Sequence, residues 1–121
     1  MKKPPFHKSV LFTFRGIIWI LRNERNFQFH ILGLIINLFL IVFFELSNIE
    51  TAMILLCCFF VLVTEALNTC VEKICDYIQP EFDSRIGIIK DLAGGAVMLA
   101  TISSVCVGIL IYWPYLKLIF Y

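Results

Sequence analysis

A long uncharged segment near the C-terminus limits this chain to few folds. Residues 92–116 contain no Asp, Glu, Lys or Arg. About 20 apolar residues in a helix are enough to cross the hydrocarbon core of a bilayer. The segment begins with the small residues Ala93 to Ala96, which allow close helix contact in lipid, and ends beside interfacial aromatic residues such as Trp113. We therefore predict a membrane-spanning helix over residues 91–115, with Pro114 at its fraying end.

Two further apolar runs indicate two more spans. Ile31 to Phe44 contains Asn37 as its one strongly polar interruption, and a second run extends from Thr51 through Val63. The chain is 60% hydrophobic and 16% charged, whereas soluble domains hold about 45–50% apolar and about 25% charged residues. We predict spans over residues 28–46 and 51–78, with the end of the second span projecting beyond the hydrocarbon and stopped by Gln79-Pro80.

The segment before the first span is apolar but carries regularly spaced basic residues. Lys8, Arg15 and Arg22 are seven residues apart and so share one face of a helix. We predict that residues 6–25 form an amphipathic helix on an anionic membrane surface, or a helix that packs on the bundle. A polar break over residues 23–30 separates this helix from the first span. A charged connector over residues 81–90 separates the second span from the third. The predicted fold is therefore an all-α membrane protein in one domain, 1–121, with a surface helix and three transmembrane helices.

The basic residues predict how the chain is oriented. Most Lys and Arg residues lie before the first span or between the second and third spans, and the loop between the first two spans has none. The positive-inside rule then places the N-terminus and the second loop in the cytoplasm of a bacterial inner membrane. The net charge is +1 and there is no run of basic residues, so we expect no nucleic-acid partner. The five cysteines include no CxxC motif, which argues against a zinc site or a disulfide framework.

A polar stripe runs along the second predicted span. Glu65, Asn68, Glu72 and Asp76 lie at offsets of 0, 3, 7 and 11 and share one helical face. Glu65 lies inside the apolar run, where a carboxylate costs about 2.5–3.5 kcal/mol on insertion scales. Such a carboxylate could accept a proton from a lipid hydroxyl at the headgroup boundary.

The predicted topology brings other charged groups to the same membrane face. Glu24 precedes the first span, and Lys90-Asp91 enters the third. Mg²⁺ typically takes one or two carboxylates together with phosphate oxygens and water, and a lysine is a usual partner of a transferring phosphoryl group. The pattern indicates ATP-dependent phosphorylation at a membrane surface, although neither a GxxxxGK[ST] loop nor a protein-kinase motif set is present.

The combined motif resembles the small prokaryotic diacylglycerol kinases, a family that includes undecaprenol kinases. The matching residues are Asn23-Glu24 with Phe27, then Glu65-x-x-Asn68-Thr69-x-x-Glu72-x-x-x-Asp76, then Lys90-Asp91-x-Ala93-x-x-Ala96-Val97.

The resemblance implies a lipid kinase that transfers the γ-phosphate of MgATP to a lipid hydroxyl, in a homotrimer whose sites are shared between subunits. It implies Glu65 as general base and Glu24 and Glu72 as Mg²⁺ ligands. The implied ATP-binding residues are Glu24, Asn68, Glu72, Asp76, Lys90 and Asp91, with Glu81 and Asp83 near the nucleoside.

Two departures bear on substrate binding. Phe12 stands where the family has an aromatic hydroxyl that can contact nucleotide on the surface helix, so nucleotide contacts from that helix stay open. The segment Arg25-Asn26-Phe27-x-x-His30 resembles the undecaprenol-kinase branch. The acceptor therefore stays open between diacylglycerol and undecaprenol.

The alternative is a non-enzymatic three-helix membrane subunit or a cation-conducting assembly, in which the stripe joins helices or lines a path. Glu24 would then pair with Arg25 or Lys8, Glu72 with Lys73, and Lys90-Asp91 would be an ordinary pair at a helix start. His30 is interpreted as interfacial packing rather than a ligand.

Overall fold

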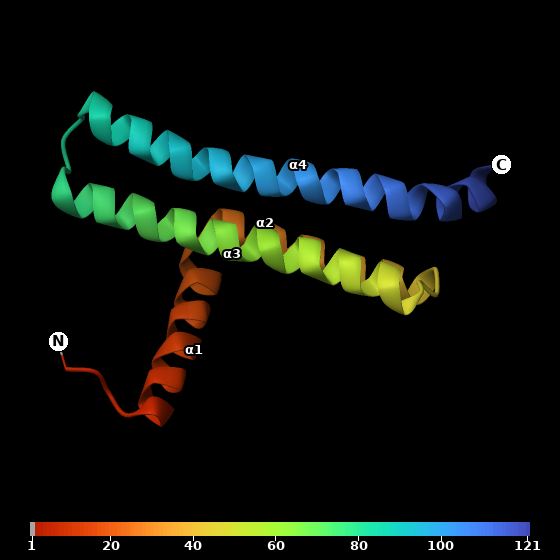
Figure 1. The fold of residues 1–121 in the computed structure, drawn as a ribbon, viewed down its shortest axis with the longest axis horizontal. Helices are drawn as coiled ribbons and strands as arrows, with labels where there is room; N and C mark the ends of the chain where they lie inside the picture. The colour runs from red at the N-terminus through yellow and green to blue at the C-terminus, as the bar shows by residue number, and fades with distance from the viewer. Residues whose placement is uncertain (1) are drawn as a thin grey trace.

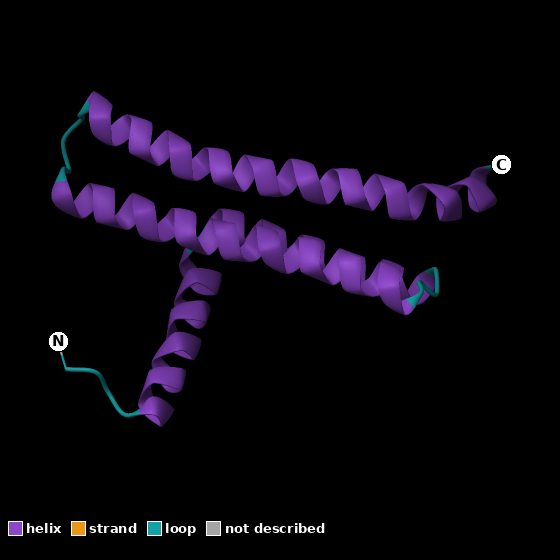
Figure 2. Ribbon diagram, in the orientation of Figure 1, coloured by secondary structure: helices purple, strands orange, loops and turns teal. Residues whose placement is uncertain are grey.

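Four helices make up the protein in a computed structural model, which describes residues 2–121. They are α1 (Phe6–Asn23), α2 (Arg25–Phe43), α3 (Asn48–Ile78) and α4 (Ser84–Phe120). Helix and short loops account for all of the described chain, without strands (Figure 2). Helices α2, α3 and α4 are each long and apolar enough to cross a membrane. The prediction of an all-α membrane protein with three spans is confirmed.

Helix α3 is the central element of the fold. It runs antiparallel to α4 along most of its length, and α2 packs against it from another side (Figure 1). In the most apolar 18-residue segment of α3, 33% of the residues are buried. The corresponding shares are 6% for α2 and 11% for α4. Helix α1 leaves the bundle at a steep angle to the other three helices (Figure 1), as expected of a helix that lies on the membrane surface while the others cross it.

Helix α3 begins at a complete capping box. The Ser47 hydroxyl accepts a hydrogen bond from the Glu50 backbone N–H, and the Glu50 carboxylate accepts one from the Ser47 N–H. Because two unpaired N–H groups of the first turn are satisfied in this way, the helix starts sharply after a short connection from α2. It ends at Ile78, directly before Gln79 and Pro80.

The break between the first two helices is shorter than the polar segment 23–30 suggests. Only Glu24 is non-helical, with an extended backbone at φ −108° and ψ 113°. The Gln28 side chain donates to the carbonyls of Leu21 (3.0 Å) and Arg22 (3.4 Å) at the end of α1. These bonds satisfy carbonyls that a helix end leaves unpaired, so one extended residue is enough to turn the chain.

The last helix is longer than the predicted span 91–115 at both ends. Asp83 caps it by accepting the Arg85 N–H at 2.8 Å, so the predicted connector 81–90 is helical from Ser84. At the other end α4 passes through Pro114 and continues to Phe120, so the expectation of fraying at Pro114 is wrong. Tyr115 holds this turn by donating to Glu50 (2.6 Å) and by packing near Phe44.

Few side chains are buried within one chain. A small apolar cluster joins Ile20 of α1, Phe27 of α2 and Leu62 of α3, with Ile31, Leu34 and Ala66 packed against it. Large apolar residues are exposed along all four helices, among them Leu56 at 72% and Leu99 at 71%. Such exposure suits a chain surrounded by lipid or by other membrane helices. The cluster matters here because it fixes α1 and α2 beside the polar part of α3.

Candidate active site

The buried polar side chains of α3 lie next to that apolar cluster. Glu65 is 3% exposed, Thr69 4% and Asn68 8%, and these three are the buried polar residues of the described chain. Leu62 and Ala66, which belong to the cluster or pack on it, flank Glu65 along the helix. Thr69 turns its hydroxyl back to the Glu65 carbonyl at 3.0 Å. Glu65 and Asn68 are therefore inward-facing members of the stripe.

Glu65 faces the second turn of α2. Its Oε2 atom lies 3.9 Å from Nε2 of His30, whose side chain is 27% exposed. Glu24 and Glu72 are close enough for their charges to act on Glu65, and the Asn26 side chain is also near. Because α2 begins at Arg25, Glu65 is level with the start of that span, and α3 continues past it for about 20 Å. The carboxylate thus lies at the depth where an apolar span gives way to polar chain.

Asn68 joins the buried and exposed parts of the stripe. Its Nδ2 donates to Oε1 of Glu72 at 3.2 Å. Its Oδ1 is buried without a hydrogen-bond partner among the described residues. A buried amide oxygen without a partner is costly, typically by about 1–3 kcal/mol. The free acceptor and the adjacent carboxylate together suit a ligand that brings a donor or a cation.

The outer end of the stripe contacts α4. Nζ of Lys90 lies 2.5 Å from Oδ1 of Asp76, and the side chains are 37% and 62% exposed. This pair confirms that the topology brings the stripe and Lys90 together. Asp91 instead lines an open hollow of about 590 Å³ on α4, beside Gly95 and Ala96. Within one chain, Asp91 therefore belongs to a different surface from Asp76.

Glu24 occupies the single extended position between α1 and α2 and is partly buried. In the loop before α4, Glu81 is exposed, whereas Asp83 binds the Arg85 guanidinium at 3.0 Å. The Arg85 side chain and backbone N–H hold the pKa of the Asp83 carboxyl below its usual range. Asp83 is thus already engaged as a helix cap.

The carboxylates present fit a magnesium ion that travels with phosphates. No cluster of three or more His, Cys, Asp and Glu side chains with metal-binding geometry occurs within residues 2–121. Glu72 is exposed next to Asn68, and Glu24 is near enough to influence Glu65. Mg²⁺ usually keeps several waters and takes only one or two carboxylates besides substrate phosphates. Two hard oxygen ligands therefore match this mode of binding.

The structure also shows contacts that the sequence pattern did not predict. His30 faces Glu65 instead of serving only as interfacial packing. Lys73 lies over the Trp19 ring at 5.2 Å from its centroid, which connects α1 with the polar end of α3. His30 ends the segment Arg25-Asn26-Phe27-x-x-His30, but nothing in that segment indicates a contact with Glu65, because the contact depends on how α2 packs on α3.

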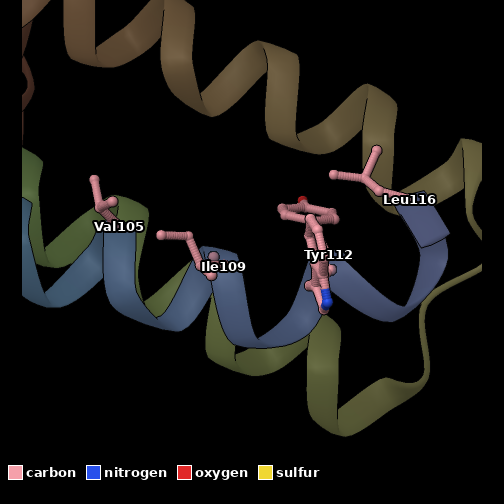
Figure 3. A pocket seen from close by; sticks show the side chains of 6 residues that line it. Val105, Ile109, Tyr112 and Leu116 are labelled. Carbon is pink, nitrogen blue, oxygen red and sulfur yellow. The ribbon is translucent and has the colours of Figure 1, made fainter. Parts of the chain in front are cut away.

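The opposite end of the bundle is lined mainly by apolar and aromatic side chains. An open hollow of about 320 Å³ on α4 is lined by apolar and aromatic side chains (Figure 3). Tyr112, labelled in Figure 3 beside Ile109 and Leu116, donates its hydroxyl to Oδ1 of Asn37 at 2.8 Å. None of the predicted site residues lines this hollow.

Three apolar helices with a buried carboxylate and a polar stripe at one end are the features of a small integral-membrane protein. Residues 11–112 match the family described as Prokaryotic diacylglycerol kinase. An undecaprenol kinase of Bacillus subtilis is 37% identical over 90% of this chain and 89% of its own length. The chain belongs to the prokaryotic diacylglycerol kinase family. It is a membrane lipid kinase and carries out ATP-dependent phosphoryl transfer.

Other relatives agree with this assignment. A diacylglycerol kinase of Synechocystis is 30% identical over 83% of this chain, which spans 58% of that relative's length. A diacylglycerol kinase of Escherichia coli is 23% identical over 89% of this chain and 88% of its own length. Relatives named undecaprenol kinase and relatives named diacylglycerol kinase therefore both align with most of the chain, and a non-enzymatic subunit is not favoured.

Proposed function

We propose that this lipid kinase transfers the γ-phosphate of MgATP to the hydroxyl of a membrane lipid, with Glu65 as general base. The observation that supports the proposal most is the position of Glu65, buried beside His30 and level with the start of α2. Asn68 and Glu72 follow on the same face toward the polar end. Glu72 is about 10 Å further along the helix than Glu65, so one helix face connects a lipid-soluble acceptor with a water-soluble donor.

In the proposed reaction Glu65 accepts the proton of the lipid hydroxyl. The lipid O–H bond breaks, a carboxylate oxygen of Glu65 gains the proton, and the lipid oxygen forms a bond to the γ-phosphorus while the bond to ADP breaks. The apolar cluster of Ile20, Phe27 and Leu62 excludes water from one side of Glu65. Exclusion of water favours transfer to the lipid over hydrolysis. The free Oδ1 of Asn68 is available to orient a donor group of the substrates.

Glu24 and Glu72 are the proposed ligands of Mg²⁺. The ion would reduce the charge of the ATP phosphates and support the departure of ADP. Glu72 is held by Asn68, which fixes one carboxylate oxygen and leaves the other free to bind. Glu24 is fixed by its position between two helices.

Lys90, Asp91 and Asp76 are the proposed nucleotide contacts at the outer end. Lys90 is paired with Asp76 and would exchange this partner, in part, for phosphate oxygens. The family resemblance implies a homotrimer, and the exposed apolar faces and the separate surface around Asp91 are surfaces that neighbouring chains would cover. In that assembly Glu24 or Lys90-Asp91 of a neighbouring chain would complete the site.

We further propose undecaprenol as the first candidate acceptor, with diacylglycerol as the second. The relative named undecaprenol kinase is 37% identical, whereas the relatives named diacylglycerol kinase are 30% and 23% identical. The segment from Arg25 to His30, which is similar to the undecaprenol-kinase branch, supports the same order. The family and the three apolar helices support a bacterial inner membrane. The distribution of basic residues supports an orientation with the N-terminus and the α3–α4 loop in the cytoplasm.

The test is a side-by-side acceptor assay with purified protein in mixed micelles. With MgATP present, we expect phosphorylation of undecaprenol and less of diacylglycerol, and no product after Mg²⁺ is chelated. Glu24→Gln and Glu72→Gln should each raise the Mg²⁺ concentration needed for activity. Glu45→Gln, at an exposed position in the α2–α3 turn, is the matched control. Phosphorylation of neither lipid would contradict the proposal.

A further inference from the structure

The proposed reaction, on which this inference rests, leaves a proton on Glu65 in every turnover. That proton must leave before the carboxylate can serve again as a base. Glu65 is only 3% exposed, and Leu62, Phe27 and Ile20 form an apolar cluster beside it. Water therefore does not reach the carboxylate freely, and some polar group has to connect it with solvent.

His30 is the group best placed for this connection. Its Nε2 lies 3.9 Å from Oε2 of Glu65, and 27% of its side chain is exposed, against 4% for Glu65. An imidazole can accept and release a proton at ordinary pH. The distance exceeds that of a direct hydrogen bond, but one water molecule can hydrogen-bond to both atoms across such a gap.

The other groups near Glu65 are less suited to this task. Glu72 and Glu24 act on Glu65 through their charges, but both are the proposed metal ligands and need to remain ionised. Asn26 is also near, but its amide neither ionises nor accepts a proton near neutral pH, so it does not carry a proton from Glu65 to solvent. His30 on α2 is therefore the one neighbour that is titratable, partly exposed and free of a metal role.

We propose that His30 is a proton relay that returns Glu65 to its ionised state after each phosphoryl transfer. In the relay step the O–H bond of the protonated Glu65 breaks and an N–H bond forms at Nε2 of His30, through one bridging water. The imidazolium then gives its proton to bulk water at the membrane boundary. The released proton balances the one removed from the lipid hydroxyl, and no further reactant is needed.

A relay acts after the bond-forming step, so its loss has a characteristic kinetic effect. The first turnover starts from an ionised Glu65 and needs no relay. Rapid-quench measurements on His30→Ala, with the lipid that the wild type phosphorylates, should show a first turnover close to the wild-type rate. A burst of about one product per site should precede a steady state slowed at least about tenfold. Added imidazole should restore the steady-state rate, and this rate should rise with the imidazole concentration.

The control is His7→Ala, because His7 is exposed near the start of α1; this variant should match the wild type in both phases. His30→Gln keeps a polar side chain of similar size and replaces the alanine variant if the latter loses its helical content or changes its elution in detergent. A first turnover slowed as much as the steady state, or an unchanged steady state, would overturn the relay. A wild type inactive on both lipids would instead contradict the proposed function itself.

Discussion

The side-chain amide of Asn68 donates to Glu72 at 3.2 Å, while its own oxygen is buried without a partner. A residue retained only for folding would rarely keep a buried acceptor unpaired, because an apolar residue of similar size avoids that cost. The unpaired oxygen is the observation behind the proposal that Asn68 contacts a substrate.

Asn68→Leu should lower activity without lowering stability. The substitution removes the bond to Glu72 and the unpaired oxygen together, so we expect kcat/KM for ATP to fall about 10²-fold, as when a positioned polar group is lost. The midpoint of thermal unfolding in detergent should stay the same or rise. Asn48→Leu, at the exposed first residue of α3, should change neither quantity. A clear loss of stability with normal kinetics would contradict this interpretation.

The contact between Lys73 and Trp19 should hold the surface helix against α3. The lysine Nζ lies 5.2 Å from the centre of the Trp19 ring, and cation–π contacts at exposed sites contribute about 0.5–1 kcal/mol. Lys73→Met keeps most of the side-chain length but removes the charge. We expect faster trypsin cleavage at Arg15 and Arg22 and a changed Trp19 emission, measured in a Trp113→Phe background.

Lys117→Met is the matched control for this experiment, since it removes a lysine at the far end of α4. Unchanged emission and cleavage in Lys73→Met would show that the contact does not restrain α1. Activity is a useful second measurement, because Lys73 is adjacent to Glu72 in the chain.

The end of the bundle opposite the site should contribute stability and not catalysis. Tyr112 joins α4 to α2 through its 2.8 Å bond to Asn37, whose own amide nitrogen donates to the Gly33 carbonyl. Tyr112→Phe should lower the free energy of unfolding by about 1 kcal/mol and leave kcat unchanged. Tyr77→Phe, at a side chain 93% exposed, should leave both unchanged. A fall in kcat for Tyr112→Phe would indicate coupling between the two ends of the bundle.

Much of the fold could be predicted from the sequence because the bilayer permits few alternatives. Three apolar stretches require three helices, since backbone groups in hydrocarbon must be paired within the segment. Helix ends were less predictable. The start of α4 depends on the Asp83 side chain, which accepts the Arg85 backbone N–H. The turn after Pro114 is held by Tyr115, whose hydrogen-bond partner Glu50 is distant in the sequence.

The candidate site, like the fold, was predictable only in part. Periodicity placed Glu65, Asn68 and Glu72 on one face, and the hairpin topology brought Lys90 to Asp76. The contact of His30 with Glu65 could not be predicted, because it depends on the packing of Phe27 and Ile20 against Leu62. That packing also depends on the break at Glu24, which Gln28 stabilises from α2.

Glu65→Gln tests the central claim most directly, because it keeps the size and polarity of the side chain and removes the base. The measurement is lipid phosphorylation together with equilibrium binding of MgATP by the same preparation, with Glu72→Gln as the comparison for binding. We predict that Glu65→Gln loses at least about 10²-fold in kcat, while its affinity for MgATP stays close to that of the wild type. Retained turnover, or an equal loss of turnover and MgATP binding, would contradict the account.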